Sequence, residues 1–330
     1  MTHIYNIISH IKIFFNSFLI STEDFMFLIE KTGVHKGVPY VKICRVSDFD
    51  IRKIFDCGQC FRFDAVENSS HEAEFCGVAH GRFISVAQDG DDVYVYNCTE
   101  EEYERIFCHY LALDADYGEI NRDILSRSDS EALRRAVEHG RGIRILRQEP
   151  WEAVCSFIVS QNNNIPRIKK IIENMSRRCG EHIDVPEELF KRCAKDTGIY
   201  AFPTPKALLD IGVDGIFDLR TGFRAKYIYD AADKFYRGDI DEGLLFSAES
   251  TDDCIEHLCA IKGVGPKVAS CALLFGFERY DAFPVDVWIK KVISKYFSSD
   301  GEEFSPKSLG EYAGIAQQYL FYYERYIEGK

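Results

Sequence analysis

The stretch Gly263-Val264-Gly265-Pro266 constrains the fold of this chain more than any other part of the sequence. It lies between two runs of apolar residues at helical spacing. Glycines permit a tight turn whose backbone N–H groups can approach a ligand closely, and proline suits the first position of a helix, where an N–H has no partner. The stretch therefore predicts a helix-hairpin-helix over about residues 252–277.

Lys267 and Asp286 form a candidate catalytic pair around this hairpin. Lys267 falls in the first turn of the second helix, where the helix dipole and partial burial would favour the neutral, nucleophilic amine. Asp286 follows Pro284 and is typical of the N-cap of a third helix. An amine near a carboxylate is suited to attack on a sugar carbon through a Schiff base.

The start of the second helix is also suited to a phosphate, because a helix N-terminus favours an anion. We expect the backbone of Gly263, Gly265 and Val268 to bind DNA phosphate. An alternative is a purely structural hairpin with a surface lysine, since many DNA-binding proteins use such a hairpin without chemistry.

Charge is distributed unevenly along the 330 residues. The net charge is −13, which by itself argues mildly against a nucleic-acid partner. Residues 64–131 contain 17 acidic and 4 basic side chains, whereas residues 134–178 contain 10 basic and 4 acidic ones, a local balance of +6. Because the local field governs docking more than the net charge does, the second segment predicts a basic, DNA-compatible surface.

The cysteines and the N-terminal residues bear on the cellular compartment in which the protein is expected. Twelve cysteines at irregular spacing indicate a reducing cytoplasm. Cys57 and Cys60 form a lone C-x-x-C, for which we expect two half-buried thiols beside a turn and no structural metal. Polar residues interrupt the apolar residues 1–25, so neither a membrane span nor a secretion signal is expected there.

The order of the patterns predicts an α+β chain. Alternation in Val93-Tyr94-Val95-Tyr96, after the turn signal Asp89-Gly90, predicts a β-hairpin, and residues 60–63 and 82–86 are typical of further strands. From about residue 100 onward the spacing is helical. The division expected is a flexible extension at 1–36, an antiparallel sheet domain at 37–130 and a mostly helical domain at 131–330. Helices are expected to begin at Ser130, Pro150 and near Lys206, and a closing helix at about 306–327.

The hairpin with Lys267 and Asp286 resembles the motif of the helix-hairpin-helix (HhH-GPD) DNA glycosylases. Residues 58–62, GQCFR, and 162–167, NNNIPR, resemble segments of the 8-oxoguanine DNA glycosylases within that superfamily. The resemblance implies a bifunctional enzyme that flips 8-oxoguanine out of duplex DNA, expels the base through attack of Lys267 on C1′, and cleaves the strand by β-elimination. Asp286 would assist lysine deprotonation and stabilise positive charge on the sugar. No cofactor is implied and no metal-binding residues are assigned, although the resemblance also allows a monovalent or calcium ion at the hairpin, on the carbonyls of Cys259, Ile261 and Val264.

The resemblance also assigns a base pocket. The Gly58 carbonyl would contact the lesion, Gln317 its Watson–Crick edge, and Phe321 and Cys271 its two faces. Gln317 and Phe321 are four residues apart and therefore share a helix face. Gln318 is the rival amide, but its register does not match the family.

Opposite the lesion, Asn162 would fill the gap left by the flipped base, and Arg167 would contact its orphaned partner. Phe223 would wedge into the duplex where the family usually has tyrosine, and Arg224 would face the estranged base. The alternative for Phe223 is a core residue at a helix start. Trp288 stands where the eukaryotic pattern has a phosphate-contacting histidine.

Two alternatives stay open: a related helix-hairpin-helix glycosylase for other damaged bases, and a non-catalytic helix-hairpin-helix DNA-binding protein. Lys267 argues against simple base-expelling members, which need only the aspartate, and no cysteine follows Cys271 to form an iron–sulfur cluster. The expected partner is double-stranded DNA containing 8-oxoguanine, with no membrane. We expect a monomer that is cytoplasmic, associated with the nucleoid in a bacterium or with the nucleus in a eukaryote.

Overall fold

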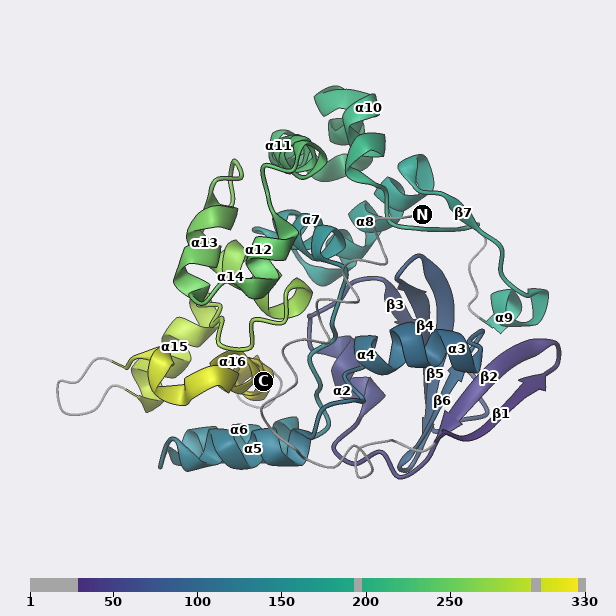
Figure 1. The fold of residues 1–330 in the computed structure, drawn as a ribbon, viewed down its shortest axis with the longest axis horizontal. Coiled ribbons are helices and arrows are strands. Elements are labelled where there is room, and N and C mark those ends of the chain that lie inside the picture. Colours follow the sequence, from purple (N-terminus) through teal and green to yellow (C-terminus); the bar gives the residue numbers. More distant parts are fainter. Residues whose placement is uncertain (1–28, 193–197, 298–303, 326–330) are drawn as a thin grey trace.

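The computed structural model describes residues 29–192, 198–297 and 304–325 (Figure 1). A six-stranded antiparallel sheet has the strand order β1-β2-β6-β5-β4-β3. Its strands are β1 (Ile29–His35), β2 (Val38–Ile43), β3 (Phe63–Ala65), β4 (Ala73–Ala79), β5 (Arg82–Asp89) and β6 (Asp92–Tyr96). The predicted N-terminal antiparallel sheet is thus confirmed.

Local turn chemistry accounts for the β5–β6 hairpin, in which Asp89 pairs with Asp92 and Gly90 has a φ of +55°. Val93 and Val95 alternate into the core, as the sequence pattern predicts. Two expectations were wrong. Residues 60–62 lie outside the strands, and β3 begins only at Phe63. Residues 29–35, assigned to the N-terminal extension, form the edge strand β1; the rest of that extension, residues 1–28, lies outside the described residues.

Both faces of the sheet are covered. On one face, Val93 and Val95 pack with Ile54 of α2 (Ile51–Asp56) and with Phe107 of the helical segment that follows β6. That segment consists of α3 (Glu100–Glu102), a π-helical turn (Tyr103–Phe107) and α4 (Cys108–Tyr110). On the other face, Phe83 packs with Leu189 and Ile199, which belong to α9 (Glu187–Arg192) and β8 (Ile199–Tyr200). The small pair of β8 with β7 (His182–Ile183) was missed because two-residue strands show no alternation.

The remaining chain is mostly helical, as predicted. Its helices are α5 (Tyr117–Ser126), α6 (Glu131–Gly140), α7 (Pro150–Ser160), α8 (Ile165–Cys179), α10 (Pro205–Ile216), α11 (Ala225–Arg237), α12 (Glu242–Ser247), α13 (Thr251–Cys259), α14 (Pro266–Gly276), α15 (Val287–Tyr296) and α16 (Ala313–Tyr323). Helices α7 and α14 lie against each other in the centre, and α6 lies against α16 (Figure 1). The helices expected to begin at Ser130, Pro150 and near Lys206 are present; Ser130 is the N-cap of α6, Pro150 is the first residue of α7, and Thr204 is the N-cap of α10.

The closing helix differs from the prediction. Residues Pro306–Tyr312 form a 3-10 helix that bends at Gly310, where φ is +73°, and α16 begins only at Ala313. A Cβ at residue 310 would lie 2.5 Å from the guanidinium of Arg127, the C-cap of α5, so the bend also permits close packing. Residues 326 and 327 lie outside the described part of the chain. Within that part, none of the helices combines the length and the apolar character needed to cross a bilayer.

Candidate active site and DNA-facing residues

The predicted helix-hairpin-helix consists of α13, the turn at 260–265 and α14. Its two glycines are needed for different reasons. Gly263 has a φ of +77°, and a Cβ there would lie 2.5 Å from the ring of Tyr227. Gly265 has a φ of −110°, and a Cβ there would meet nothing within 4 Å. The fold therefore requires glycine at 263, whereas the open space beside Gly265 is suited to the close approach of a ligand to the backbone.

The charges of the candidate catalytic pair, Lys267 and Asp286, both act on Cys271, which was expected against one face of the base. Asp286 is the N-cap of α15, and its Oδ1 accepts a hydrogen bond from Ile289 N at 2.8 Å, as predicted. Cys271 is buried, which raises the pKa of its thiol; the charge of Lys267 opposes this shift and that of Asp286 adds to it. Lys267 occupies the first turn of α14 but is exposed, so the partial burial expected for it is wrong. The site therefore offers an accessible amine beside a carboxylate and a buried thiol.

The adjacent amides of α16 have different partners, and this bears on which one is available to a base. Gln317 and Gln318 are only 4% and 3% exposed. Gln318 Nε2 donates to the carbonyl of Cys57 at 2.9 Å. The Gln317 side chain makes no hydrogen bond to any residue within 29–192, 198–297 or 304–325. Because a buried amide needs a partner, the arrangement favours Gln317 for binding a ligand, and the half-buried Phe321 follows it on the same helix face.

The Gly58 loop, residues 57–60, is held rigidly beside this helix. Gly58, which follows the C-cap residue of α2, has a φ of +82°. The next side chain, Gln59, is fully buried; its Nε2 donates to the Arg144 carbonyl at 2.9 Å, and its Oε1 accepts from Leu146 N at 2.8 Å. Gln148 Nε2 donates to the Gln59 carbonyl at 2.7 Å. Gln59 was not predicted from the sequence; the signal that could have identified it is an amide between two cysteines, both of which prove buried.

Residues 144–148 connect the Gly58 loop to the catalytic helix. Gln148 N donates to the Phe275 carbonyl of α14 at 3.0 Å. Arg147 Nε lies 2.8 Å from the Tyr280 hydroxyl and 3.1 Å from Glu278, both in the segment that leads to Asp286. The fully buried guanidinium of Arg144 donates to backbone carbonyls of Ser47, Asp48, Ala112 and Ala115. Both arginines were counted in the predicted basic surface, which was wrong for these two. Arg144 is bound to backbone carbonyls, and Arg147 forms ion pairs with Asp114 and Glu278.

The predicted asparagine loop lies between α7 and α8. Asn162 is exposed with a φ of +47°, and Asn164 caps α8 by accepting from Arg167 N at 3.0 Å. The Arg167 side chain is exposed. Arg224 was expected to face the estranged base. In this structure it is 3% exposed, and it donates through Nε to the Gln161 carbonyl at 2.9 Å and through Nη2 to the Asn162 carbonyl at 3.0 Å. Arg224 therefore holds the Asn162 loop in place.

Phe223 has the exposure required of a wedge. It is 52% exposed in the 3-10 turn Gly222–Arg224, so the alternative of a core phenylalanine is wrong. Its ring lies edge-on to the ring of Tyr227, with the two ring centres 6.0 Å apart, and Tyr227 also packs on Gly263. The candidate wedge and the hairpin thus share one supporting side chain. Trp288 is also partly exposed on α15, and the Lys291 ammonium lies 4.8 Å from its ring centre.

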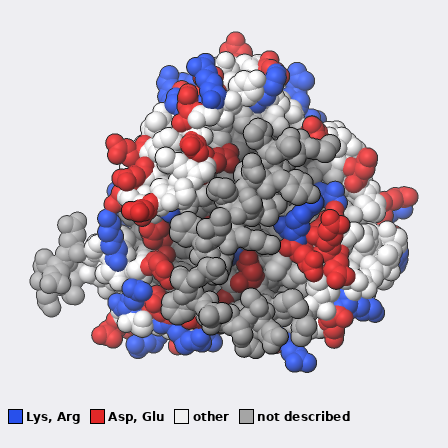
Figure 2. Space-filling model, in the orientation of Figure 1, with Lys and Arg blue, Asp and Glu red and all other residues white. Residues whose placement is uncertain are grey.

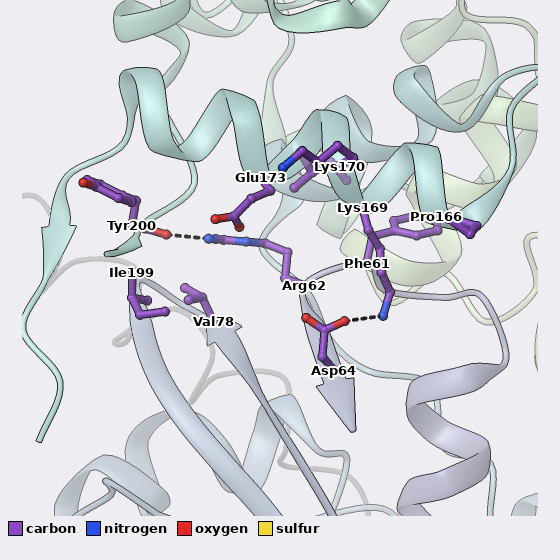
Figure 3. A pocket seen from close by; sticks show the side chains of 11 residues that line it. Phe61, Arg62, Asp64, Val78, Pro166, Lys169, Lys170, Glu173, Ile199 and Tyr200 are labelled. Atoms are coloured by element: carbon purple, nitrogen blue, oxygen red, sulfur yellow. Dashed lines mark hydrogen bonds and ion pairs between the residues drawn. The ribbon is translucent and has the colours of Figure 1, made fainter. Parts of the chain in front are cut away.

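A cavity of about 320 Å³ lies between β3, β4, the first turns of α8, and β8 (Figure 3). Three of its charged side chains have partners within it: Arg62 donates to the Tyr200 carbonyl, and Lys169 contacts Asp64 at 2.9 Å. None of the predicted pocket residues, Gly58, Cys271, Gln317 and Phe321, lines this cavity. It is therefore distinct from the candidate base pocket.

Acidic side chains gather over α12 and α13 in the left part of the face drawn in Figure 2. On α13, the acidic residues Asp252, Asp253 and Glu256 are exposed. Part of the negative charge of the chain thus lies on this flank of the hairpin, on a helix that carries none of the residues proposed to contact DNA.

The sequence matches known families along most of its length. Residues 42–154 match the N-terminal domain of 8-oxoguanine DNA glycosylase, and residues 155–311 match the HhH-GPD superfamily of base excision DNA repair proteins. The N-glycosylase/DNA lyase OGG1 of Arabidopsis thaliana is 29% identical over 315 residues, which cover 89% of this chain and 81% of that protein.

Solved structures show the same similarity. MBOgg1 in complex with a low-affinity DNA ligand is 39% identical, with a TM-score of 0.78 over 91% of this chain and 100% of that chain. The 8-oxoguanine glycosylase/lyase of Clostridium acetobutylicum, in complex with duplex DNA containing cytosine opposite 8-oxoguanine, is 38% identical. Its TM-score is 0.77 over 90% of this chain and 98% of that chain.

Proposed function

Because this chain belongs to the 8-oxoguanine DNA glycosylases of the HhH-GPD superfamily, we propose that it excises 8-oxoguanine from duplex DNA and cleaves the abasic strand that results. The observation that carries the proposal is that the charges of Lys267 and Asp286 both act on the buried thiol of Cys271 beside the hairpin. An amine and a carboxylate that both act on one buried thiol support attack on the sugar of a flipped nucleotide.

In the proposed reaction, the neutral amine of Lys267 attacks C1′ of the flipped nucleotide. The N-glycosidic bond breaks, and the base leaves with the bonding electrons and takes up a proton. Asp286 accepts the lysine proton and stabilises positive charge on the sugar. The C1′–O4′ bond then breaks, O4′ takes up a proton, and the open-chain sugar is left joined to Lys267 as a Schiff base. The Schiff base permits loss of a proton from C2′ and departure of the 3′ phosphate. Because Lys267 is exposed in the free protein, its desolvation comes from the bound DNA.

The other residues divide into three groups. The Gly58 carbonyl, Gln317, Phe321 and Cys271 surround the lesion. At the duplex from which the lesion is flipped, the contacts come from Asn162, Arg167 and Phe223, and Arg224 supports the Asn162 loop. The backbone of Gly263, Gly265 and Val268 binds phosphate. Neither alternative accounts for as much. A non-catalytic protein has no use for the uncommitted, buried Gln317, and a simple base-expelling glycosylase has no use for Lys267.

The substrate places the enzyme at the DNA of its cell, in the nucleoid of a bacterium or the nucleus of a eukaryote. We also propose the domain boundary at residue 130. Helices α5 and α6 lie on either side of this boundary, and both contact helical segments near the C-terminus.

The decisive test is trapping of the covalent intermediate. Incubation with a duplex containing 8-oxoguanine opposite cytosine, in the presence of borohydride, should yield a covalent protein–DNA adduct. Lys267→Gln should abolish the adduct while leaving DNA binding largely intact, because an amide cannot form a Schiff base. Trapping of Lys267→Gln at the wild-type yield would show that another residue is the nucleophile.

A further inference from the structure

We infer that Gln318 is a positioning residue for substrate specificity: its amide fixes the orientation of the Gly58 carbonyl that contacts 8-oxoguanine. The inference rests on the proposed function and adds to it a residue that does not itself touch the base. It starts from a chemical difference. 8-Oxoguanine carries a hydrogen on N7 where guanine has a lone pair, so a correctly aimed carbonyl attracts the damaged base and repels the normal one.

Aiming that carbonyl is difficult because glycine has the freest backbone of all residues. The Gly58 carbonyl can hold one direction only if the peptide units on both sides are anchored. On the downstream side, Gln59 is anchored by hydrogen bonds through its side chain and its carbonyl. On the upstream side, the Cys57 N–H bonds to the Lys53 carbonyl at 3.0 Å, and the Cys57 carbonyl accepts from Gln318 Nε2 at 2.9 Å.

The upstream anchor comes from the helix that carries the other base contact. Gln317 and Gln318 are neighbours on α16, so a single rigid helix holds both the proposed contact to the Watson–Crick edge and the anchor of the Gly58 loop. The relative position of the two recognition elements is thereby fixed. A neutral amide suits this buried position, because a charged donor would need a buried counter-ion. The neighbouring Cys57 thiol adds no charge, since burial raises its pKa to about 12.

The test compares two reactions of the same protein. Excision of 8-oxoguanine opposite cytosine requires recognition of the base, whereas cleavage at a preformed abasic site does not. Under single-turnover conditions, Gln318→Leu should lower excision about tenfold relative to abasic-site cleavage, equivalent to about 1.4 kcal/mol of transition-state stabilisation. The matched control is Tyr319→Phe on the same helix, α16. It removes a buried hydrogen bond of 2.8 Å from Tyr319 Oη to Asn121 Oδ1 of α5, which does not involve the Gly58 loop. Its ratio of the two rates should equal that of the wild type.

A second variant makes the anchor titratable. In Gln318→Glu the neutral acid can donate to the Cys57 carbonyl, whereas the ionised carboxylate repels it. The ratio of excision to abasic-site cleavage, relative to wild type at each pH, should therefore fall as pH rises in Gln318→Glu and stay constant in Gln318→Leu.

Two outcomes separate the hypotheses. A wild-type protein that does not excise 8-oxoguanine refutes the proposed function. Normal wild-type excision, together with an unchanged ratio in Gln318→Leu or a pH-independent ratio in Gln318→Glu, refutes the role of Gln318 alone.

Discussion

The two roles of Asp286, helix cap and proposed catalytic carboxylate, can be separated by substitution. Its contribution to the cap is one hydrogen bond from Ile289 N, 2.8 Å long. Asparagine caps about as well as aspartate, so Asp286→Asn should lose only the attraction between the charge and the helix dipole, roughly 0.3–1 kcal/mol. Asp286→Ala also loses the cap, which costs about 1 kcal/mol more. In a chain of this length, 1 kcal/mol lowers Tm by about 2 °C.

Activity should follow a different order. Both variants lack the carboxylate, and loss of a group that transfers a proton typically slows a reaction by about 10²-fold or more. We therefore expect Asp286→Asn and Asp286→Ala to be comparably inactive in single-turnover excision, while only the alanine variant loses about 2–4 °C in thermal unfolding.

The matched control is Ser130→Ala at the N-cap of α6, where Ser130 Oγ accepts from Leu133 N at 3.3 Å. This variant should lose stability through its cap and keep full activity. The reasoning would be refuted if Asp286→Asn remained active. It would equally be refuted if Asp286→Asn lost as much stability as Asp286→Ala and its activity fell only in proportion to the unfolded fraction, because Asp286 would then be a structural cap alone.

Two further predictions concern recognition and pH. Gln317→Ala should weaken excision of 8-oxoguanine by about 1–3 kcal/mol without making guanine a substrate. Gly58→Val, which strains a φ of +82°, should instead reduce the preference for 8-oxoguanine over guanine, measured in the same duplex. The reverse result would contradict this division of roles. Hydrogen bonds to Asp114 and Glu278 raise the pKa of His109 to about 9, so its stabilisation is complete below pH 6.5 and lost as pH rises through 9. His109 is half exposed, so this amounts to about 1 kcal/mol, and chemical denaturation of His109→Gln should lack that pH dependence.

Local chemistry explains why much of this protein could be predicted from its sequence. The hairpin turn, Pro266 at a helix start, and the caps at Asp286 and Ser130 depend on groups within a few residues of one another. The β5–β6 hairpin likewise follows from a turn glycine and alternating side chains. Such features need no partner from elsewhere in the chain, so a short window of sequence contains the whole physical cause.

What only the tertiary structure decided involves partners that are distant in sequence. Arg144 belongs by its charge to a basic segment, but carbonyls about 30 to nearly 100 residues away draw it into the core. Arg224 is likewise occupied by the asparagine loop. The clearest case is the pair on α16. Gln317 and Gln318 are chemically identical, and a rotation of about 100° between helix neighbours gives one of them to Cys57 and leaves the other without a partner in the described chain. Their chemistry is encoded locally, but which amide is free to bind a base depends on what the fold places beside each of them.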